Sequence, residues 1–135
     1  MLTRKGKYGL KALIHLAQTP SPQLAFVGEI GARNNIPKKF LDTILGDLRK
    51  AGFVQSRKGK EGGYRLSRPA SDITVAEVLH STEGSMAAVS CLESGENGCE
   101  RAAQCLTLPM WKKLDAVMDN YLSGVSVQDL LDGKA

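Results

Sequence analysis

The sequence predicts a mainly α-helical fold with one small β-hairpin. Two observations support this prediction. Apolar residues recur at intervals of three and four over most of the chain, and only two short runs, near residues 53–57 and 63–66, read as strands. Aromatic residues make up 5% of the chain, so the core should be mostly aliphatic. A length of 135 residues suits one domain with its own core.

Three helices are expected in the first part of the chain, at about residues 4–18, 27–33 and 38–50. Thr3 is a suitable N-cap for the first, and Pro37 is a suitable first residue for the third. The third helix should be amphipathic. The side chains expected to be buried on it are Phe40, Leu41, Ile44, Leu45 and Leu48, and those expected on its open face are Lys38, Lys39, Asp42, Thr43, Arg49 and Lys50.

The second and third helices, joined by a tight turn, match a helix-turn-helix, and the hairpin that follows sharpens this interpretation. Its loop and loop ends carry cations among glycines: Arg57, Lys58, Gly59, Lys60, Gly62 and Gly63. Glycines let a backbone approach a surface closely, and cations supply phosphate or minor-groove contacts. The combination predicts a winged helix that binds DNA. The alternative is an ordinary surface hairpin with solvated lysines.

The distribution of charge agrees with a nucleic-acid partner. Residues 1–68 hold 14 Lys and Arg against 4 Asp and Glu, a net charge of +10, whereas residues 69–135 hold 4 against 10, a net charge of −6. A basic half supplies steering and counterion release on a polyanion. Two solvated faces of opposite sign are the alternative. We expect residues 1–68 to form the DNA-binding region and residues 69–135 to complete the same compact unit.

The second half is expected to contain a short helix, a loop and a long helix. Thr74 and Glu77 form a capping-box pattern at the start of the short helix. The long helix, at about residues 109–122, carries a stripe at helical spacing that either closes the core or forms a dimer interface. The candidate dimerisation residues in this stripe are Trp111, Leu114, Met118 and Tyr121. Residues 125–131 form a final short segment.

Three cysteines, Cys91, Cys99 and Cys105, lie in the loop with the spacing Cys-x7-Cys-x5-Cys. Thiolates are soft ligands that suit iron–sulfur clusters, zinc or copper(I), and the close Cys pairs of structural zinc sites are absent from this spacing. The loose spacing therefore favours a polynuclear cluster. Thiol redox chemistry without metal and chemically inert buried cysteines are the alternatives.

The chain also resembles a family, the Rrf2 family of bacterial transcriptional regulators, which includes the IscR, NsrR, RirA and CymR branches. The resemblance spans nearly the whole chain. Its motifs are the opening residues 2–10, the segment 48–54, the wing at residues 59–66, the three cysteines and the segment 105–111.

The resemblance implies a homodimer joined through the long C-terminal helix, a near-palindromic operator in double-stranded DNA, and control of DNA binding by cluster occupancy. Lys39, Asp42 and Thr43 match the base-reading positions of the family, and Lys58 matches a wing arginine that enters the minor groove. The residues that would contact phosphates are Thr3, Lys5 and Tyr8.

The sequence departs from two branches at the fourth cluster ligand. Leu108 stands where the IscR branch has a histidine, and Lys7 stands where the NsrR branch has a carboxylate. The cysteine spacing is most similar to that of the RirA branch. Three thiolates with one open position favour a [4Fe–4S] cluster over a [2Fe–2S] cluster. Glu93, Glu96, Glu100 and His80 are further candidate ligands, whereas His15 is expected to be packed.

The leading hypothesis is a cytoplasmic repressor that senses iron or redox state through its cluster. A DNA-binding regulator with a metal-free thiol switch is the second hypothesis. A thiol enzyme has little support, because no Cys–His pair, phosphate loop or carboxylate pair occurs at a useful spacing. No apolar stretch approaches the length of a membrane span, and the N-terminus does not read as a signal peptide.

Overall fold

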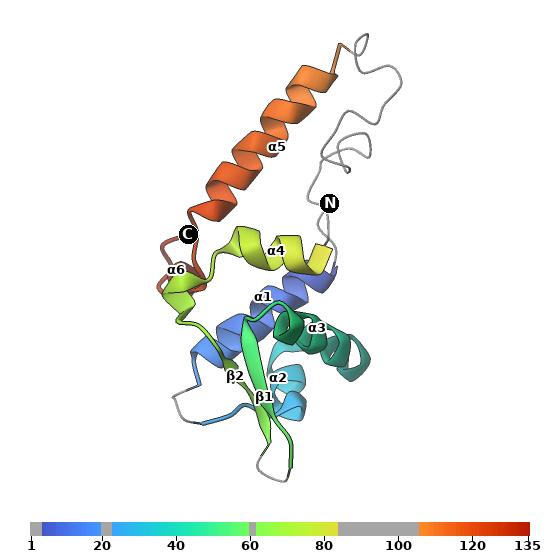
Figure 1. Cartoon of the computed structure of the whole chain (residues 1–135), viewed down its shortest axis with the longest axis vertical. Helices are drawn as coiled ribbons and strands as arrows, with labels where there is room; N and C mark the ends of the chain where they lie inside the picture. Colours follow the sequence, from blue (N-terminus) through green and yellow to red (C-terminus); the bar gives the residue numbers. More distant parts are fainter. Residues whose placement is uncertain (1–3, 20–22, 60–61, 84–105) are drawn as a thin grey trace.

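The computed structural model describes residues 4–19, 23–59, 62–83 and 106–135, and its helices and strands follow one another in the predicted order (Figure 1). Thr3, the predicted N-cap of the first helix, lies outside these ranges. The elements are α1 (Arg4–Ala17), α2 (Val27–Asn34), α3 (Lys38–Lys50), β1 (Val54–Arg57), β2 (Gly63–Leu66), the 3₁₀ turn η1 (Ala70–Asp72), α4 (Val75–Glu83), α5 (Leu108–Ser123) and α6 (Val127–Leu131). The fold is mainly helical with one antiparallel hairpin, as predicted.

The core is aliphatic and centres on α1 and α3. Helix α1 buries Ala12 and Leu13 completely, and α3 places four fully buried side chains against the same core, Leu41, Ile44, Leu45 and Leu48. Each such side chain stabilises the fold by about 1.5–3 kcal/mol relative to an exposed one. The prediction that Phe40 is buried was wrong. Phe40 is 49% exposed because it lies on the flank of α3, beside the Tyr8 ring of α1.

The turn between α2 and α3 depends on Asn35, which adopts a left-handed conformation with φ 55°. Asparagine tolerates this conformation better than most residues with a side chain. The next N–H, that of Ile36, donates to the carbonyl oxygen of Gly31 at 3.0 Å. Pro37 is the N-cap of α3 and not its first helical residue as predicted, so the helix begins at Lys38. Gly52, at φ 86°, follows α3 in a left-handed conformation, which favours glycine.

The hairpin packs against α1 and α3, and Ala25, from the segment before α2, adds a backbone bridge to it. Strands β1 and β2 pair from Val54 with Leu66 to Arg57 with Gly63. Ala25 bridges the other edge of β2, since it exchanges two backbone hydrogen bonds of 2.9 Å with Tyr64. A Cβ atom on Gly63 would lie 2.5 Å from the carbonyl oxygen of Ala25. Glycine at position 63 therefore serves the internal approach of two backbones.

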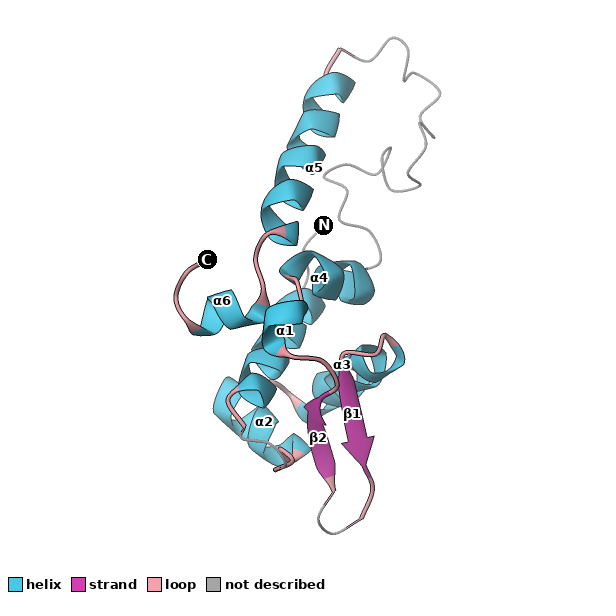
Figure 2. Cartoon of the chain, turned by 60° about the vertical axis from the view of Figure 1, so that its left-hand side comes forward, coloured by secondary structure: helices cyan, strands magenta, loops and turns pink. Residues whose placement is uncertain are grey.

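The C-terminal segment packs back onto the first half. The backbone N–H of Val127 donates to the carbonyl oxygen of Ile73 at 2.9 Å, and Val127 is fully buried in the core that contains α1 and α3. Helix α5, in contrast, extends away from the rest of the molecule beyond α4, and it lies at the opposite end from the hairpin strands β1 and β2 (Figures 1 and 2). None of the helices in the described part of the chain is long and apolar enough to cross a bilayer.

Candidate nucleic-acid interface

Helix α3 presents a polar face that is open to a partner. Its first half carries four exposed side chains that the sequence singled out, Lys38, Lys39, Asp42 and Thr43. They follow the helical repeat, while Leu41 and Ile44, on the opposite side of the helix, are fully buried. Because the buried face is rigidly packed, the exposed side chains are held on a fixed backbone. They offer two ammonium donors, one carboxylate acceptor and one hydroxyl group on one surface.

The beginning of α1 lies beside this face of α3. The ammonium group of Lys5 is 2.8 Å from a carboxylate oxygen of Asp47, so this predicted phosphate contact also ties α1 to α3. The ring of Tyr8 packs against that of Phe40, with 6.3 Å between ring centroids and an interplanar angle of 52°. An open hollow of about 800 Å³ lies between the two helices. Its lining residues are Arg4, Lys5, Lys39, Phe40, Thr43 and Ile44.

The hairpin carries a second group of exposed cations. Arg57 and Lys58 are exposed at the end of β1, as the sequence predicts. Arg65 is exposed on the same face of the hairpin, and its Nε donates to the side-chain oxygen of Gln55 at 3.1 Å. The sequence interpretation missed Arg65, although the alternation of side chains along β2 places it opposite Gln55 on the outer face.

Gly62 closes the turn of the hairpin. Its N–H donates to the carbonyl oxygen of Gly59 at 3.0 Å, and a Cβ atom on Gly62 would collide with the carbonyl oxygens of Arg57 and Gly59. Gly59 itself has φ 115°, a conformation that favours glycine. The glycines of this loop are therefore required for the turn itself, whatever surface the loop contacts.

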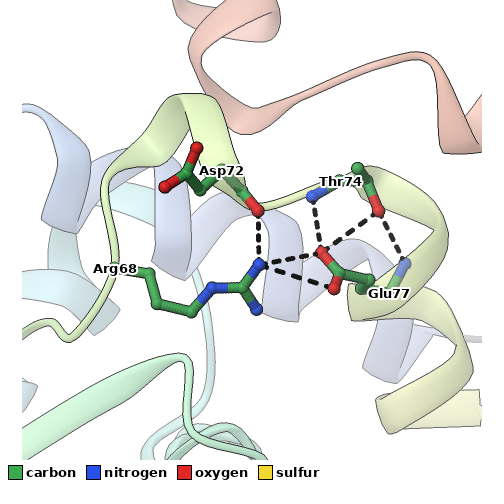
Figure 3. Close-up of polar contacts among 4 residues, drawn as sticks. All are labelled: Arg68, Asp72, Thr74 and Glu77. Atoms are coloured by element: carbon green, nitrogen blue, oxygen red, sulfur yellow. Dashed lines mark hydrogen bonds and ion pairs between the residues drawn. The ribbon is translucent and has the colours of Figure 1, made fainter.

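Arg68 joins the end of the hairpin to the start of α4 (Figure 3). Its guanidinium group lies 5.6 Å from the ring centroid of Phe53 and donates to the carbonyl oxygen of Asp72. It also donates to the Glu77 carboxylate at 3.3 Å. The Thr74 N–H donates to Glu77 at 3.0 Å and the Glu77 N–H donates to the Thr74 hydroxyl at 3.2 Å, which confirms the predicted capping box.

The hydrogen bond from the Thr74 N–H, together with the nearby Arg68 charge, lowers the pKa of Glu77 from its ordinary value of 4.5. The carboxylate therefore remains ionised at neutral pH. The positive end of the α4 dipole stabilises this negative charge, and the carboxylate holds the Arg68 side chain in place.

Several predicted site residues lie outside the described residues, namely Thr3, Lys60, Cys91, Cys99 and Cys105, as do Glu93, Glu96 and Glu100. Within the described ranges no group of three His, Cys, Asp or Glu side chains could hold a metal ion. His15 is packed, as predicted, with 6% of its surface exposed and Asn34 donating to its Nδ1 at 3.2 Å. His80 Nε2 instead lies 3.1 Å from a carboxylate oxygen of Asp119, which links α4 to α5.

Helix α5 exposes an apolar stripe that differs in part from the predicted one. Leu114 and Tyr121 are exposed by 41% and 57%, whereas Trp111 and Met118 are partly buried. The exposed stripe is completed by two residues that the sequence interpretation missed. Its members are Met110, Leu114, Val117 and Tyr121. Their spacing of four, three and four residues is that of a helix–helix seam.

Comparisons with known proteins agree with this arrangement. A sequence profile of the Rrf2 family, described as an iron-dependent transcriptional regulator, matches residues 2–133. A putative HTH-type transcriptional regulator of Neisseria meningitidis is 32% identical over 98% of this chain and 88% of that protein. The HTH-type transcriptional regulator IscR of Photorhabdus laumondii is 33% identical over 98% of this chain and 80% of that protein.

Solved structures are similar over the whole chain. CymR, the global cysteine regulator of B. subtilis, superposes with a TM-score of 0.74 at 27% identity, covering 100% of this chain and 98% of that one. IscR of T. potens gives a TM-score of 0.77 at 26% identity, covering 100% and 88%. These relatives are regulators of transcription and not enzymes. The profile match and the identities above 30% over almost the full length together show that this chain belongs to the Rrf2 family of DNA-binding transcriptional regulators.

Proposed function

We propose that the chain acts in the cytoplasm as a homodimeric repressor whose binding to a near-palindromic operator depends on an iron–sulfur cluster. The observation that carries the DNA-binding part is the open face of α3. There Lys38, Lys39, Asp42 and Thr43 project from a helix whose opposite face is fully buried. In the major groove an ammonium group donates to guanine and a carboxylate accepts from the cytosine amino group. Lys39 and Asp42 are assigned these two roles.

The remaining contacts are assigned to the sugar–phosphate backbone and the minor groove. Lys5 and Tyr8 lie at the start of α1, and Arg57 and Lys58 lie at the end of β1. The residues assigned with them are Thr3, Lys60, Gly62 and Gly63. A cationic side chain that neutralises a phosphate releases a counterion, so its contribution depends on salt but not on sequence.

A pair of lysine variants tests the DNA-binding role. Lys39→Ala should relax the preference at one base pair, at a cost of about 1–3 kcal/mol on the preferred sequence. Lys58→Ala should weaken binding to all duplexes and reduce the slope of log K against log salt by about 1. Lys112→Ala, on α5, is the matched control. An unchanged base preference in Lys39→Ala would remove that residue from the base-reading set.

The homodimer part of the proposal rests on α5. The stripe of Met110, Leu114, Val117 and Tyr121 is exposed on a helix that extends away from the core. Two copies of this helix that pack along the stripe would bury these side chains, with Trp111 and Met118 at its border. A two-fold symmetric dimer presents two copies of α3, which is why the operator should be near-palindromic.

The cluster part of the proposal rests on the donor set. Cys91, Cys99 and Cys105 offer three soft thiolates, which fit iron–sulfur chemistry better than they fit hard cations. In the sequence they lie between α4, which packs on α1, and α5, which carries the apolar stripe. A [4Fe–4S] cluster with one ligand other than cysteine suits three thiolates. When bound, it would supply a group whose presence depends on iron and oxygen.

The alternative is a metal-free thiol switch on the same DNA-binding scaffold. It is favoured by the similarity to CymR structures, including the oxidised form of the Staphylococcus aureus protein, which has a TM-score of 0.74 and 25% identity. Both hypotheses use the same three cysteines, so variants alone do not separate them.

Anaerobic purification separates the two hypotheses. If the chain holds a cluster, the protein should be brown, with visible absorption, iron and acid-labile sulfide in similar amounts. Cys99→Ser should lose the colour, and duplex affinity should differ between the filled and empty forms. A colourless protein with negligible iron after reconstitution, whose DNA affinity responds to thiol oxidants, would establish the alternative.

A further inference from the structure

We propose that Phe40 is a specificity-determining residue that contacts the 5-methyl group of a thymine in the operator. The inference rests on the proposed binding of duplex DNA by α3 and names one base feature that this site reads. It concerns a residue outside the base-reading set assigned above, namely Lys39, Asp42 and Thr43.

The first observation is the exposure of Phe40. Its side chain is 49% exposed, while its neighbours along the apolar repeat, Leu41 and Ile44, are fully buried. One exposed apolar side chain is common on protein surfaces and needs no explanation by itself. The surroundings of Phe40 distinguish it from such cases.

The second observation is the hollow between α1 and α3. Phe40 and Ile44 line it together with Thr43, and the cationic side chains of Arg4, Lys5 and Lys39 also line it. Lys5 is paired with Asp47, but in the described ranges no ion pair joins Arg4 or Lys39 to an acidic side chain. The hollow is therefore apolar inside and positively charged around it.

The chemistry of this hollow selects its occupant. A partner that fits must carry phosphates or similar anions and, between them, an isolated apolar group. In the major groove of duplex DNA the thymine 5-methyl group is the apolar feature among the donors and acceptors of the base edges, and phosphates flank it. Cytosine lacks this methyl group, so the contact would discriminate between the two pyrimidines.

The third observation is that the Phe40 ring is held in position. One side of it packs against Tyr8, in a tilted arrangement with ring centroids 6.3 Å apart. Such aromatic pairs are favourable and restrict rotation of the ring. Tyr8 is thus a positioning residue for Phe40, and the exposed part of the ring points to a fixed place beside Lys39 and Thr43.

A methyl scan of the operator tests the inference. The operator is first selected from randomised duplexes with the full-length dimer, and each thymine is then replaced in turn by deoxyuridine, which lacks only the methyl group. At one thymine in each half-site, the replacement should weaken binding of the wild-type protein about fourfold, the effect of one buried methyl group worth about 0.8 kcal/mol. Phe40→Ala should bind the thymine and deoxyuridine duplexes with equal affinity at that position.

Two controls make the result specific. Lys39→Ala should keep the dependence on the methyl group, although its overall affinity falls, and Tyr8→Leu should reduce that dependence without removing duplex binding. Thermal unfolding should show that Phe40→Ala is folded, as expected for a half-exposed side chain. If the selected operator is bound but no thymine shows coupling to Phe40, the inference is wrong while the proposed function stands. If no duplex is enriched, the proposed function itself fails.

Discussion

The carboxylate of Glu83 accepts a hydrogen bond of 2.9 Å from the backbone N–H of Gly6, a residue 77 positions earlier in the chain. The last residue of α4 thus caps the first turn of α1, which has no acidic residue of its own. A negative charge at this position is favoured by the positive end of the helix dipole. The same turn carries Arg4 and Lys5, which line the hollow beside α3.

Removal of this cap should loosen the start of α1. Glu83→Ala should lower the free energy of unfolding by about 1 kcal/mol and accelerate hydrogen exchange of the Gly6 amide. Glu83→Gln keeps a hydrogen-bond acceptor and loses the charge, so its free energy of unfolding should lie between those of Glu83→Ala and the wild type. Glu29→Ala is a suitable control, because it also removes one carboxylate, but one that caps no turn of α1. The Glu29 carboxylate instead lies 4.0 Å from both Arg33 and His15. Equal exchange rates at Gly6 in Glu83→Ala and the wild type would contradict this role.

Two Gly→Ala substitutions should have opposite effects on stability. In Gly63→Ala the new methyl group would lie 2.5 Å from the backbone oxygen of Ala25, so the bridge between Ala25 and Tyr64 must open. A loss of about 1–3 kcal/mol is expected from such overpacking. In Gly28→Ala, within α2, nothing lies within 4 Å of the new atom, and a gain of about 0.4–1 kcal/mol is expected. Chemical denaturation measures both, and a destabilised Gly28→Ala would argue against the open surroundings of that residue.

Stability should depend on pH through Glu77. The pKa of Glu77 is lower in the folded protein than its ordinary value of 4.5. The contribution of this carboxylate to the free energy of unfolding is therefore fully present at a pH above 4.5. It is lost as pH falls through the lowered pKa, when the carboxylate takes up a proton in the folded state as well. Glu77→Gln should therefore be less stable than the wild type at pH 7, and the difference in stability should shrink as the pH falls below 4.5 and through the lowered pKa. Thermal unfolding at several pH values tests this, and a constant difference would exclude it.

A charge in the exposed stripe of α5 should separate the proposed dimer. Val117 is 64% exposed, so Val117→Lys should leave each subunit folded and convert the dimer to a monomer. Ala116→Lys is a matched control, because Ala116 is also exposed and lies about 100° around the helix from Val117. Sedimentation velocity at micromolar concentration gives the result. A dimer that survives Val117→Lys but is lost in Ala116→Lys would move the interface to another face of α5.

The elements and the DNA-binding character of the chain could be predicted because their signals are local. The capping box joins Thr74 to Glu77, three residues away, and the apolar repeat of α3 lies within one helix. The cluster ligands are likewise predicted from a local pattern, and they remain predictions. Their residue type and spacing indicate the chemistry, but Cys91, Cys99 and Cys105 lie outside the described residues.

The stripe on α5 shows where periodicity stops being informative. Trp111 and Met118 fit a helical repeat as well as Met110 and Val117 do, and both sets share Leu114 and Tyr121. The packing of α4 against α5, which includes His80 and Asp119, accompanies the partial burial of Trp111 and Met118. Helical spacing alone does not contain that contact.

The order of helices and strands, the basic character of the first half and the polar face of α3 follow from residues close together in the chain, so the amino-acid sequence is enough to predict them. The backbone that meets Gly63, the carboxylate that caps α1 and the exposure of Phe40 are visible only in the folded chain. Each of these depends on the approach of segments far apart in the sequence, and no short-range pattern records how two such segments pack.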